Sequence, residues 1–444
     1  MIEEENVAEL SNKFANWVNL QAESDLPFAL SDSVRSSSLV KLADGIFPTR
    51  KDEEWKYTPM GELLEATPER ASGDPLDEAL LESLQKAVPE ALTLVFVDGE
   101  FSENHSNAIG IPAELEITQF SDLDNTAMQL VERIILDANL TDDNIFQHVT
   151  LGLCQNGLFI NLKKNSEVET PLHILRVTTG MGKTNFADPV SVINVSANSR
   201  LKIVEQFVSQ GDSGAVTVPA TYINVASGAG LDHYRVGLES SETYHICNTS
   251  VSVSGSGTYG SHQYLLGSKL TRSNLEVKFS EPAGYAVLRG VYLGDEEQHL
   301  DVRTYMDHAH PHCDSDQHFR GILNGESRGV FNGLVLVREQ AQQTDAKQSN
   351  KNLLLSRDAR VDAKPQLEIF ADDVKCTHGA TVGQLDEDAL FYLQSRGIGI
   401  KDATLMLTRA FAAEVTQEIE IASLQTYVHE KISSALDEIV TVND

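Results

Sequence analysis

Cysteine is scarce in this sequence, and no two cysteines are closely spaced. The 444 residues contain Cys154, Cys247, Cys313 and Cys376, with no C-x-x-C pair among them. Scattered cysteines argue against a disulfide framework and are typical of a reducing compartment. The first ten residues, MIEEENVAEL, are acidic and have no apolar centre, so we expect no secretory signal and a cytoplasmic location.

Basic residues and long apolar runs are also lacking. The chain has 34 Lys and Arg residues against 66 Asp and Glu residues, which gives a formal net charge of −32. Such a surface repels phosphate backbones, so we expect no nucleic-acid partner. No apolar run approaches the roughly 18 residues that cross a bilayer, so we expect no membrane partner either.

Common enzyme signatures are missing. There is no Gly-rich loop ending in Lys-Ser/Thr, so the chain itself cannot be a P-loop ATPase. There is no G-x-S-x-G elbow for a serine nucleophile. The Gly-rich stretch GSGTYGSH, at 255–262, precedes no helical pattern, and we interpret it as turns.

The hydrophobic pattern divides the chain into three parts. Residues 1–90 show apolar residues at helical spacing. Further along the chain, short alternating runs separated by Gly, Ser, Asn and Asp predict strands. After Gly383 the helical period returns. We therefore predict an N-terminal helical region at 1–90, a β core at 91–382 and a C-terminal helical region at 383–444.

A sandwich, a barrel and a β-helix all fit the strand pattern of the middle region. The stretch QAQQTDAKQSNKN, at 340–352, is rich in amides. Stacked coils let Asn and Gln side chains form ladders, so this stretch favours a solenoid. No strict sequence repeat accompanies it.

The segment DVKCTHGATVGQLDE, at 373–387, places Cys376 two residues before His378. On a strand, residues two apart point to the same face. A thiolate beside an imidazole is typical of a metal site or of a Cys/His nucleophile pair. Asp372 and Asp373 precede the pair, but two ligands do not close a metal site.

A second cluster lies in DHAHPHCDSDQH, at 307–318. Imidazoles that alternate along a strand invite a divalent metal. The competing interpretation is a polar rim whose histidines make ordinary hydrogen bonds, and Pro311, which interrupts the alternation, favours it. The candidate ligands are His308, His310, His312 and Cys313, with His318 further along.

Four segments carry a resemblance to a known family. They are FADDVKCTHGATVGQLDEDALFYLQSRGI (370–398), the preceding run 341–373, DHAHPHCDSDQHFRGIL (307–323) and EEWKYTPM (53–60). Together they closely resemble the SufB/SufD family of iron–sulfur cluster assembly proteins. Gly379, where SufB usually carries a glutamate, and the chain length favour the SufD branch of that family.

The resemblance implies a right-handed parallel β-helix between helical ends. It implies a non-catalytic scaffold subunit that assembles with a SufB-like paralogue and a SufC-like ATPase, the C-terminal helices docking the ATPase. A transient iron–sulfur cluster would sit at the SufB interface, held in part by His378 and Cys376, with nothing tightly bound to the isolated chain. Whether the isolated chain forms a homodimer, and whether it binds a flavin, stays open.

Two other classes remain as alternatives. One is a cytoplasmic metal-dependent hydrolase that uses His308, His310 and His312. Such an enzyme would need at least three protein ligands around one ion. The other is a β-helix polysaccharide lyase, which predicts secretion and a groove lined by carboxylates.

Overall fold

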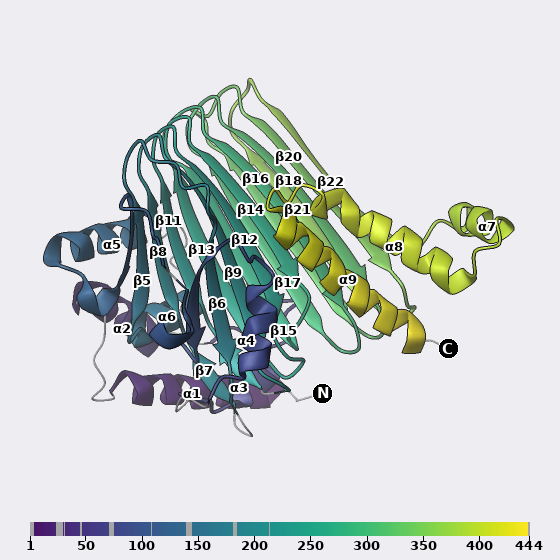
Figure 1. The fold of residues 1–444 in the computed structure, drawn as a ribbon, viewed down its shortest axis with the longest axis horizontal. Coiled ribbons are helices and arrows are strands. Elements are labelled where there is room, and N and C mark those ends of the chain that lie inside the picture. The colour runs from purple at the N-terminus through teal and green to yellow at the C-terminus, as the bar shows by residue number, and fades with distance from the viewer. Residues whose placement is uncertain are drawn as a thin grey trace.

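The structure of the chain is a computed structural model that describes residues 4–23, 30, 32–44, 47–70, 75–107, 109–138, 144–180, 184–212 and 214–442. Two long sheets of mostly parallel strands face each other, and the chain alternates between them as it advances (Figure 1). The prediction of a mainly β chain with a parallel β-helix core between helical ends is therefore confirmed.

The first sheet, sheet A, is parallel except where β4 pairs with β5. Its main path consists of β21 (Arg360–Ile369), β19 (Arg328–Val337), β17 (His299–His308), β15 (Leu270–Phe279), β13 (Tyr244–Val253), β11 (Ala220–Val225), β8 (Val190–Val195), β5 (Gly157–Leu162) and β4 (Leu115–Gln119). Three short strands join it at the side, namely β1 (Glu69–Arg70), β7 (Asn185–Ala187) and β10 (Ala215–Thr217).

The second sheet, sheet B, is parallel except where β2 pairs with β3. Its strands are β22 (Lys375–Gly383), β20 (Asp345–Leu354), β18 (Asp314–Leu323), β16 (Tyr285–Gly294), β14 (Thr258–Leu265), β12 (Gly230–Leu238), β9 (Arg200–Ser209), β6 (Leu172–Thr178), β2 (Leu92–Val97) and β3 (Glu100–Phe101). Inward-facing side chains from both sheets fill the lumen with one apolar cluster, to which Leu231, Val251, Leu275 and Phe331 belong.

Four successive coils turn a corner through a residue of positive φ. Ser256, Ala283, His312 and Gln343 occupy this position in successive coils, with φ between 55° and 63°. The N–H of each donates to a corner carbonyl of the next coil, as from His312 to the Gln342 oxygen at 2.9 Å. The repeat is therefore one of backbone conformation, which explains why the sequence shows no strict repeat.

The beginning of the solenoid is covered. Antiparallel β3 and β4 close the two sheets, and an apolar cluster joins α5 (Asn125–Ala138) and α6 (Ile145–Leu153) to β5, β8 and β11. These two helices lie within the region 91–382 that we predict as the β core. The remaining elements of this end are α1 (Glu4–Ala22), α2 (Asp32–Asp44), η1 (Glu53–Trp55), α3 (Gly61–Glu65), α4 (Glu78–Gln85), η2 (Glu103–His105) and η3 (Phe120–Asp122).

The other end of the solenoid is open. No described strand pairs with the outer edge of β21 or β22, the last strands of their sheets. Apolar side chains are exposed here: Ile369 is 40% exposed, Phe370 64% and Val382 50%. The last coil thus offers both unpaired strand edges and apolar side chains.

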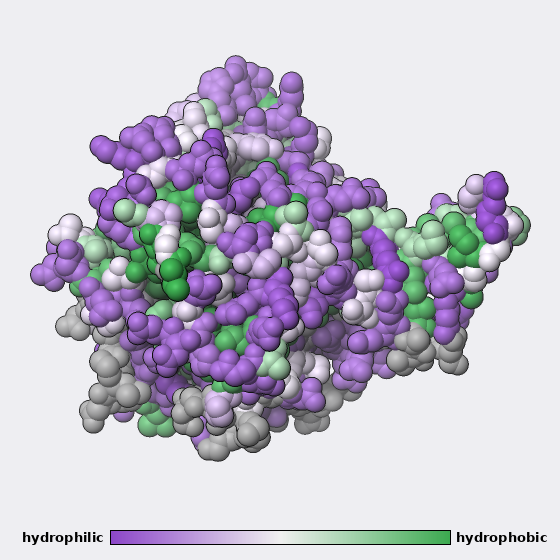
Figure 2. Space-filling view, viewed as in Figure 1, coloured by the Kyte–Doolittle hydropathy of each residue, from purple (hydrophilic) through white to green (hydrophobic). Residues whose placement is uncertain are grey.

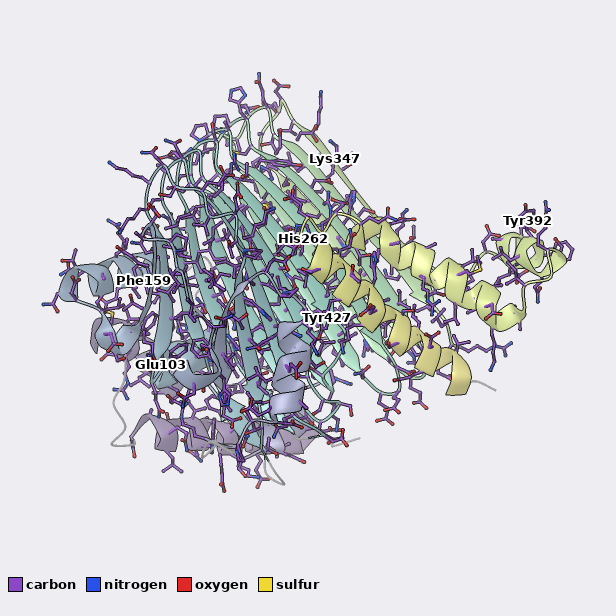
Figure 3. All side chains as sticks on the ribbon, viewed as in Figure 1. Glu103, Phe159, His262, Lys347, Tyr392 and Tyr427 are labelled. Atoms are coloured by element: carbon purple, nitrogen blue, oxygen red, sulfur yellow. The ribbon has the colours of Figure 1, made fainter. Side chains whose placement is uncertain are left out.

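The C-terminal helices are α7 (Glu387–Ser395), α8 (Ile400–Thr416) and α9 (Ala422–Val442). α8 and α9 cross the outer face of sheet B, where α9 buries Leu424 and Val428 in one cluster with Tyr234 of β12 (Figure 1). Tyr427 of α9 accepts a hydrogen bond from the Gln206 amide at 2.8 Å (Figure 3). α7 projects away from the sheets and packs on α8.

Ion pairs hold the helix pair in register with the sheet. They join Arg289 to Glu418 at 2.6 Å, Arg320 to Glu414 at 2.7 Å and Lys202 to Glu420 at 2.7 Å. α8 and α9 are therefore part of the folded body rather than a detachable tail. None of the helices in the described ranges is long and apolar enough to cross a membrane.

Replacing Leu424 by Ala tests this packing. Leu424 is 1% exposed, so its truncation should lower the free energy of unfolding by about 2–5 kcal/mol. Thr426→Ala, at an exposed position two residues along the same helix, should change it by less than about 0.5 kcal/mol. Denaturant unfolding of both variants measures the difference, and equal effects would contradict the packing of α9 on sheet B.

Candidate functional site

Cys376 and His378 lie on β22, at the open end of the solenoid. Cys376 is in register with Ala346 of β20, and His378 with Gln348. Ala346 and Gln348 are both buried and face the lumen. Both candidate ligands therefore point into the mouth of the lumen, on the same face, as their two-residue spacing predicts.

The two side chains differ in environment. Cys376 is half-buried and packs against the apolar cluster of the lumen, whereas His378 is exposed. Burial raises the pKa of the Cys376 thiol, so near pH 7 it carries its proton and must lose it before binding a metal. His378 is the more accessible donor of the two.

The pair supplies only part of a ligand set. No group of three or more His, Cys, Asp or Glu side chains in the described ranges is placed to hold a metal ion. Asp372 and Asp373 are exposed, and the N–H of Asp373 donates to the Gln342 side chain at 2.9 Å. One thiol and one imidazole match the donors that iron–sulfur clusters accept, but among the described residues they do not complete a ligand set.

His308 lies at the end of β17, fully buried. Its Nε2 is 2.9 Å from the Ser315 hydroxyl, and its ring centre is 4.8 Å from that of Phe279. Burial lowers its pKa to about 4, so the ring is neutral at physiological pH. This histidine belongs to the packed core.

The other members of the second cluster are dispersed. His310 is half-buried in the turn, His312 is exposed at the corner, and His318 pairs with Asp316 at 3.2 Å. Cys313 is buried, and its pKa is raised by burial. The three histidines of the hydrolase alternative do not converge, so the ligand set which that enzyme needs is not formed.

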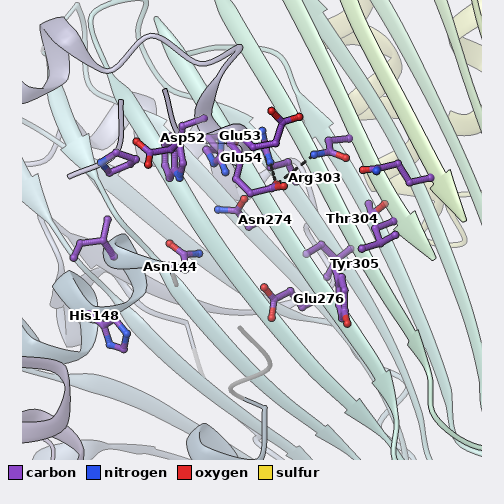
Figure 4. Close-up of a pocket in the computed structure, with 18 of the residues that line it drawn as sticks. Asp52, Glu53, Glu54, Asn144, His148, Asn274, Glu276, Arg303, Thr304 and Tyr305 are labelled. Carbon is purple, nitrogen blue, oxygen red and sulfur yellow. Dashed lines mark hydrogen bonds and ion pairs between the residues drawn. The ribbon is translucent and has the colours of Figure 1, made fainter. Parts of the chain in front are cut away.

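A groove of about 760 Å³ lies between the segment 48–55 and the outer face of sheet A (Figure 4). The EEWKYT motif anchors one side of it: Glu54 pairs with Arg303, and Trp55 stacks on Arg272, the guanidinium carbon lying 3.5 Å from the ring centre. Sequence reasoning missed this groove, although the motif itself was the available signal. Two arginines that face the groove are paired with acids, Arg272 with Asp301 and Arg303 with Glu54.

Sequence reasoning also missed Cys247, an inward-facing thiol of β13. Burial opposes its ionisation, but the charges of Arg235 and His245 outweigh this and lower its pKa to about 7. Arg235 also donates to Glu205 at 3.0 Å, deep in the lumen. This charged cluster is fully buried.

Comparison with known proteins identifies the family. Residues 177–411 match the model described as "SUF system FeS cluster assembly, SufBD core domain", and residues 21–174 match the SufBD protein N-terminal region. The two matched segments together account for most of the chain.

Individual relatives agree with the family models. The iron–sulfur cluster assembly protein SufD of Escherichia coli is 32% identical over 88% of this chain and 89% of its own. A SufBD family protein of Synechocystis is 30% identical over 87% of each chain. SufD of Bacillus subtilis is 25% identical over 79% of this chain and 83% of its own. The chain therefore belongs to the SufB/SufD family of iron–sulfur cluster assembly proteins, on the SufD side.

Proposed function

We propose that this chain is a SufD-like scaffold subunit whose open end pairs with a SufB-like paralogue, and that a nascent iron–sulfur cluster is held between the two. The observation that carries the proposal is the position of Cys376 and His378. They are two cluster donors at the uncapped mouth of the solenoid, with no third ligand among the described residues.

The open end has the properties of a pairing surface. β21 and β22 present rows of unpaired backbone groups, which a strand of another chain can satisfy. Ile369, Phe370 and Val382 add exposed apolar area at the same end. A paralogue with the same solenoid would continue both sheets, and in its absence a second copy of this chain would occupy the same surface as a homodimer.

A site divided between two chains suits a scaffold. His378 is exposed at the mouth, whereas the Cys376 thiol, whose pKa is raised by burial, must lose its proton before it binds a metal. The cluster is the cargo of the complex, so its release requires the site to open. Separating the two chains removes half of the ligands at once, which a site closed within one chain could not do.

The arm formed by α7 is the proposed docking site for the ATPase partner. Phe391 is 71% exposed and Tyr392 56%, and on α8 Ile400 and Met406 are 52% and 49% exposed. Figure 2 shows hydrophobic residues on this projecting part of the molecule. Tyr392 marks the tip of the projecting arm (Figure 3). The ATPase activity of the assembly would then belong to that partner, and this chain would transmit its movement to the open end.

Substitution of His378 tests the site. His378→Ala should leave the complex with the SufB-like and SufC-like partners intact but lower the rate of cluster formation by about tenfold or more, because a ligand is lost. Cys376→Ala should have a smaller effect, since a thiolate of the paralogue can replace it. Anaerobic reconstitution, followed by the visible absorption of the cluster, measures the rates.

Thr377→Ala is the matched control, because Thr377 is exposed between the two donors and points to the opposite face of β22. Its rate should equal that of the unsubstituted protein. If His378→Ala in an intact complex forms clusters at the normal rate, the proposed interface site is wrong.

Substitution on α7 tests the docking of the ATPase. Phe391→Asp places a charge on the exposed tip and should weaken the binding of the SufC-like partner at least tenfold, with pairing to the SufB-like chain unchanged. This change is preferable to deletion of 386–444, which would also remove α8 and α9 from sheet B.

Ile109→Asp is the control for that experiment, because Ile109 is 88% exposed but lies outside the arm. It should leave the affinity for the ATPase unchanged. Equal affinities for the unsubstituted chain and Phe391→Asp, measured by calorimetry, would remove α7 from the docking surface.

A further inference from the structure

Two buried glutamine side chains form a ladder inside the lumen, in a row that ends at the mouth. Gln317 of β18 and Gln348 of β20 are in register, and His378 of β22 is next in the same row. Gln317 and Gln348 are 0% and 3% exposed. The amide row therefore ends directly beneath the imidazole of His378.

In this ladder each hydrogen bond has a defined donor and acceptor. The Gln348 Nε2 donates to the Gln317 Oε1 at 3.4 Å, and the Thr304 hydroxyl donates to the same oxygen at 2.8 Å. Gln348 Oε1 is buried and has no hydrogen-bond partner among the described residues. A buried acceptor without a donor is costly, so this oxygen is available to an N–H on a neighbouring side chain.

The opposite sheet provides space for the Gln348 amide. A Cβ at Gly333 of β19 would lie 2.3 Å from the Gln348 Nε2. Glycine at this position allows the amide to lie across the lumen, with its Nε2 bonded to Gln317. The amide is therefore held through one N–H of its nitrogen, and its oxygen accepts no hydrogen bond from the described residues.

We propose that Gln348 is a positioning residue for His378. Its Oε1 accepts the N–H of one imidazole nitrogen, so that the lone pair of the other nitrogen is free for the cargo or for a proton. Neighbouring strands are about 4.8 Å apart, within reach of these two side chains. Histidines that bind metals commonly donate their second N–H to a carbonyl oxygen in this way. The inference rests on the proposed role of His378.

The two donors at the mouth, Cys376 and His378, differ in the side chain that lies in register with each of them. Cys376 stacks on Ala346, which offers no side-chain acceptor. The neighbours of Gln348 along β20, Lys347 and Ser349, alternate to the outer face of the sheet. Gln348 is thus the buried side-chain acceptor in direct register with either donor.

The tautomer of His378 is the direct readout. In the full chain labelled with ¹⁵N-histidine, two-bond ¹⁵N–¹H spectra distinguish a protonated ring nitrogen from an unprotonated one, and His378→Asn assigns the signals. We expect the unsubstituted chain to favour one tautomer and Gln348→Met, which lacks the acceptor, to move both nitrogen shifts toward those of a mixture. Gln348→Glu, which keeps an acceptor oxygen at this position, should restore the bias.

Gln263→Met is the matched control, because it removes a buried amide of β14 that lies outside the row of Gln317, Gln348 and His378. It should leave the tautomer of His378 unchanged. In the complex, Gln348→Met should slow cluster formation about tenfold, and Gln348→Glu should recover most of the rate. Identical ¹⁵N shifts of His378 in the unsubstituted chain and Gln348→Met would overturn the inference.

The test of Gln348 can fail independently of the test of the interface site. If His378→Ala forms clusters normally, the proposed function fails, while the ¹⁵N shifts still decide whether Gln348 sets the tautomer. If His378→Ala stops cluster formation but Gln348→Met changes neither the shifts nor the rate, only the role of Gln348 is refuted.

Discussion

Every other feature of this molecule depends on the in-register hydrogen bonding of one coil to the next. Each strand of the solenoid satisfies its backbone groups on the coil before it and the coil after it, and the corner residues continue the ladder through bonds such as that from His312 to Gln342. Such a stack must end, and an end leaves a strand edge unpaired. The chain closes the beginning with β3, β4 and helices and leaves β21 and β22 open.

The candidate site is accessible because it lies on the last coil, at the open end. A residue in the middle of the stack, such as His308, is enclosed by the neighbouring coils and becomes part of the core. A residue with the same inward direction on the last coil, such as His378, remains accessible. The same backbone geometry thus produces a buried structural histidine and an accessible donor, and the difference is only the number of coils that follow.

The C-terminal helices differ in how closely they contact the stacked coils. α8 and α9 are bound to sheet B by an apolar cluster and by ion pairs such as Arg289–Glu418, so a force applied to them reaches β16 and β18 directly. α7 has no buried side chain and extends from the body. A partner seated on the arm would therefore act on the sheet that also carries Cys376 and His378.

The sequence by itself determined that the chain is mainly β between helical ends, because alternation with period two and helical spacing are local patterns that backbone geometry enforces. The strand pattern alone left a sandwich, a barrel and a β-helix open, and the resemblance to a known family favoured the β-helix. The sequence also determined that Cys376 and His378 share a face, and its motifs identified the family. Only the tertiary structure decided which residues meet across coils, because that depends on the register between strands far apart in the sequence. No local pattern shows that His308 is enclosed, that His312 occupies a corner, or that Gln348 is in register with His378, its oxygen accepting no hydrogen bond from the described part of the chain.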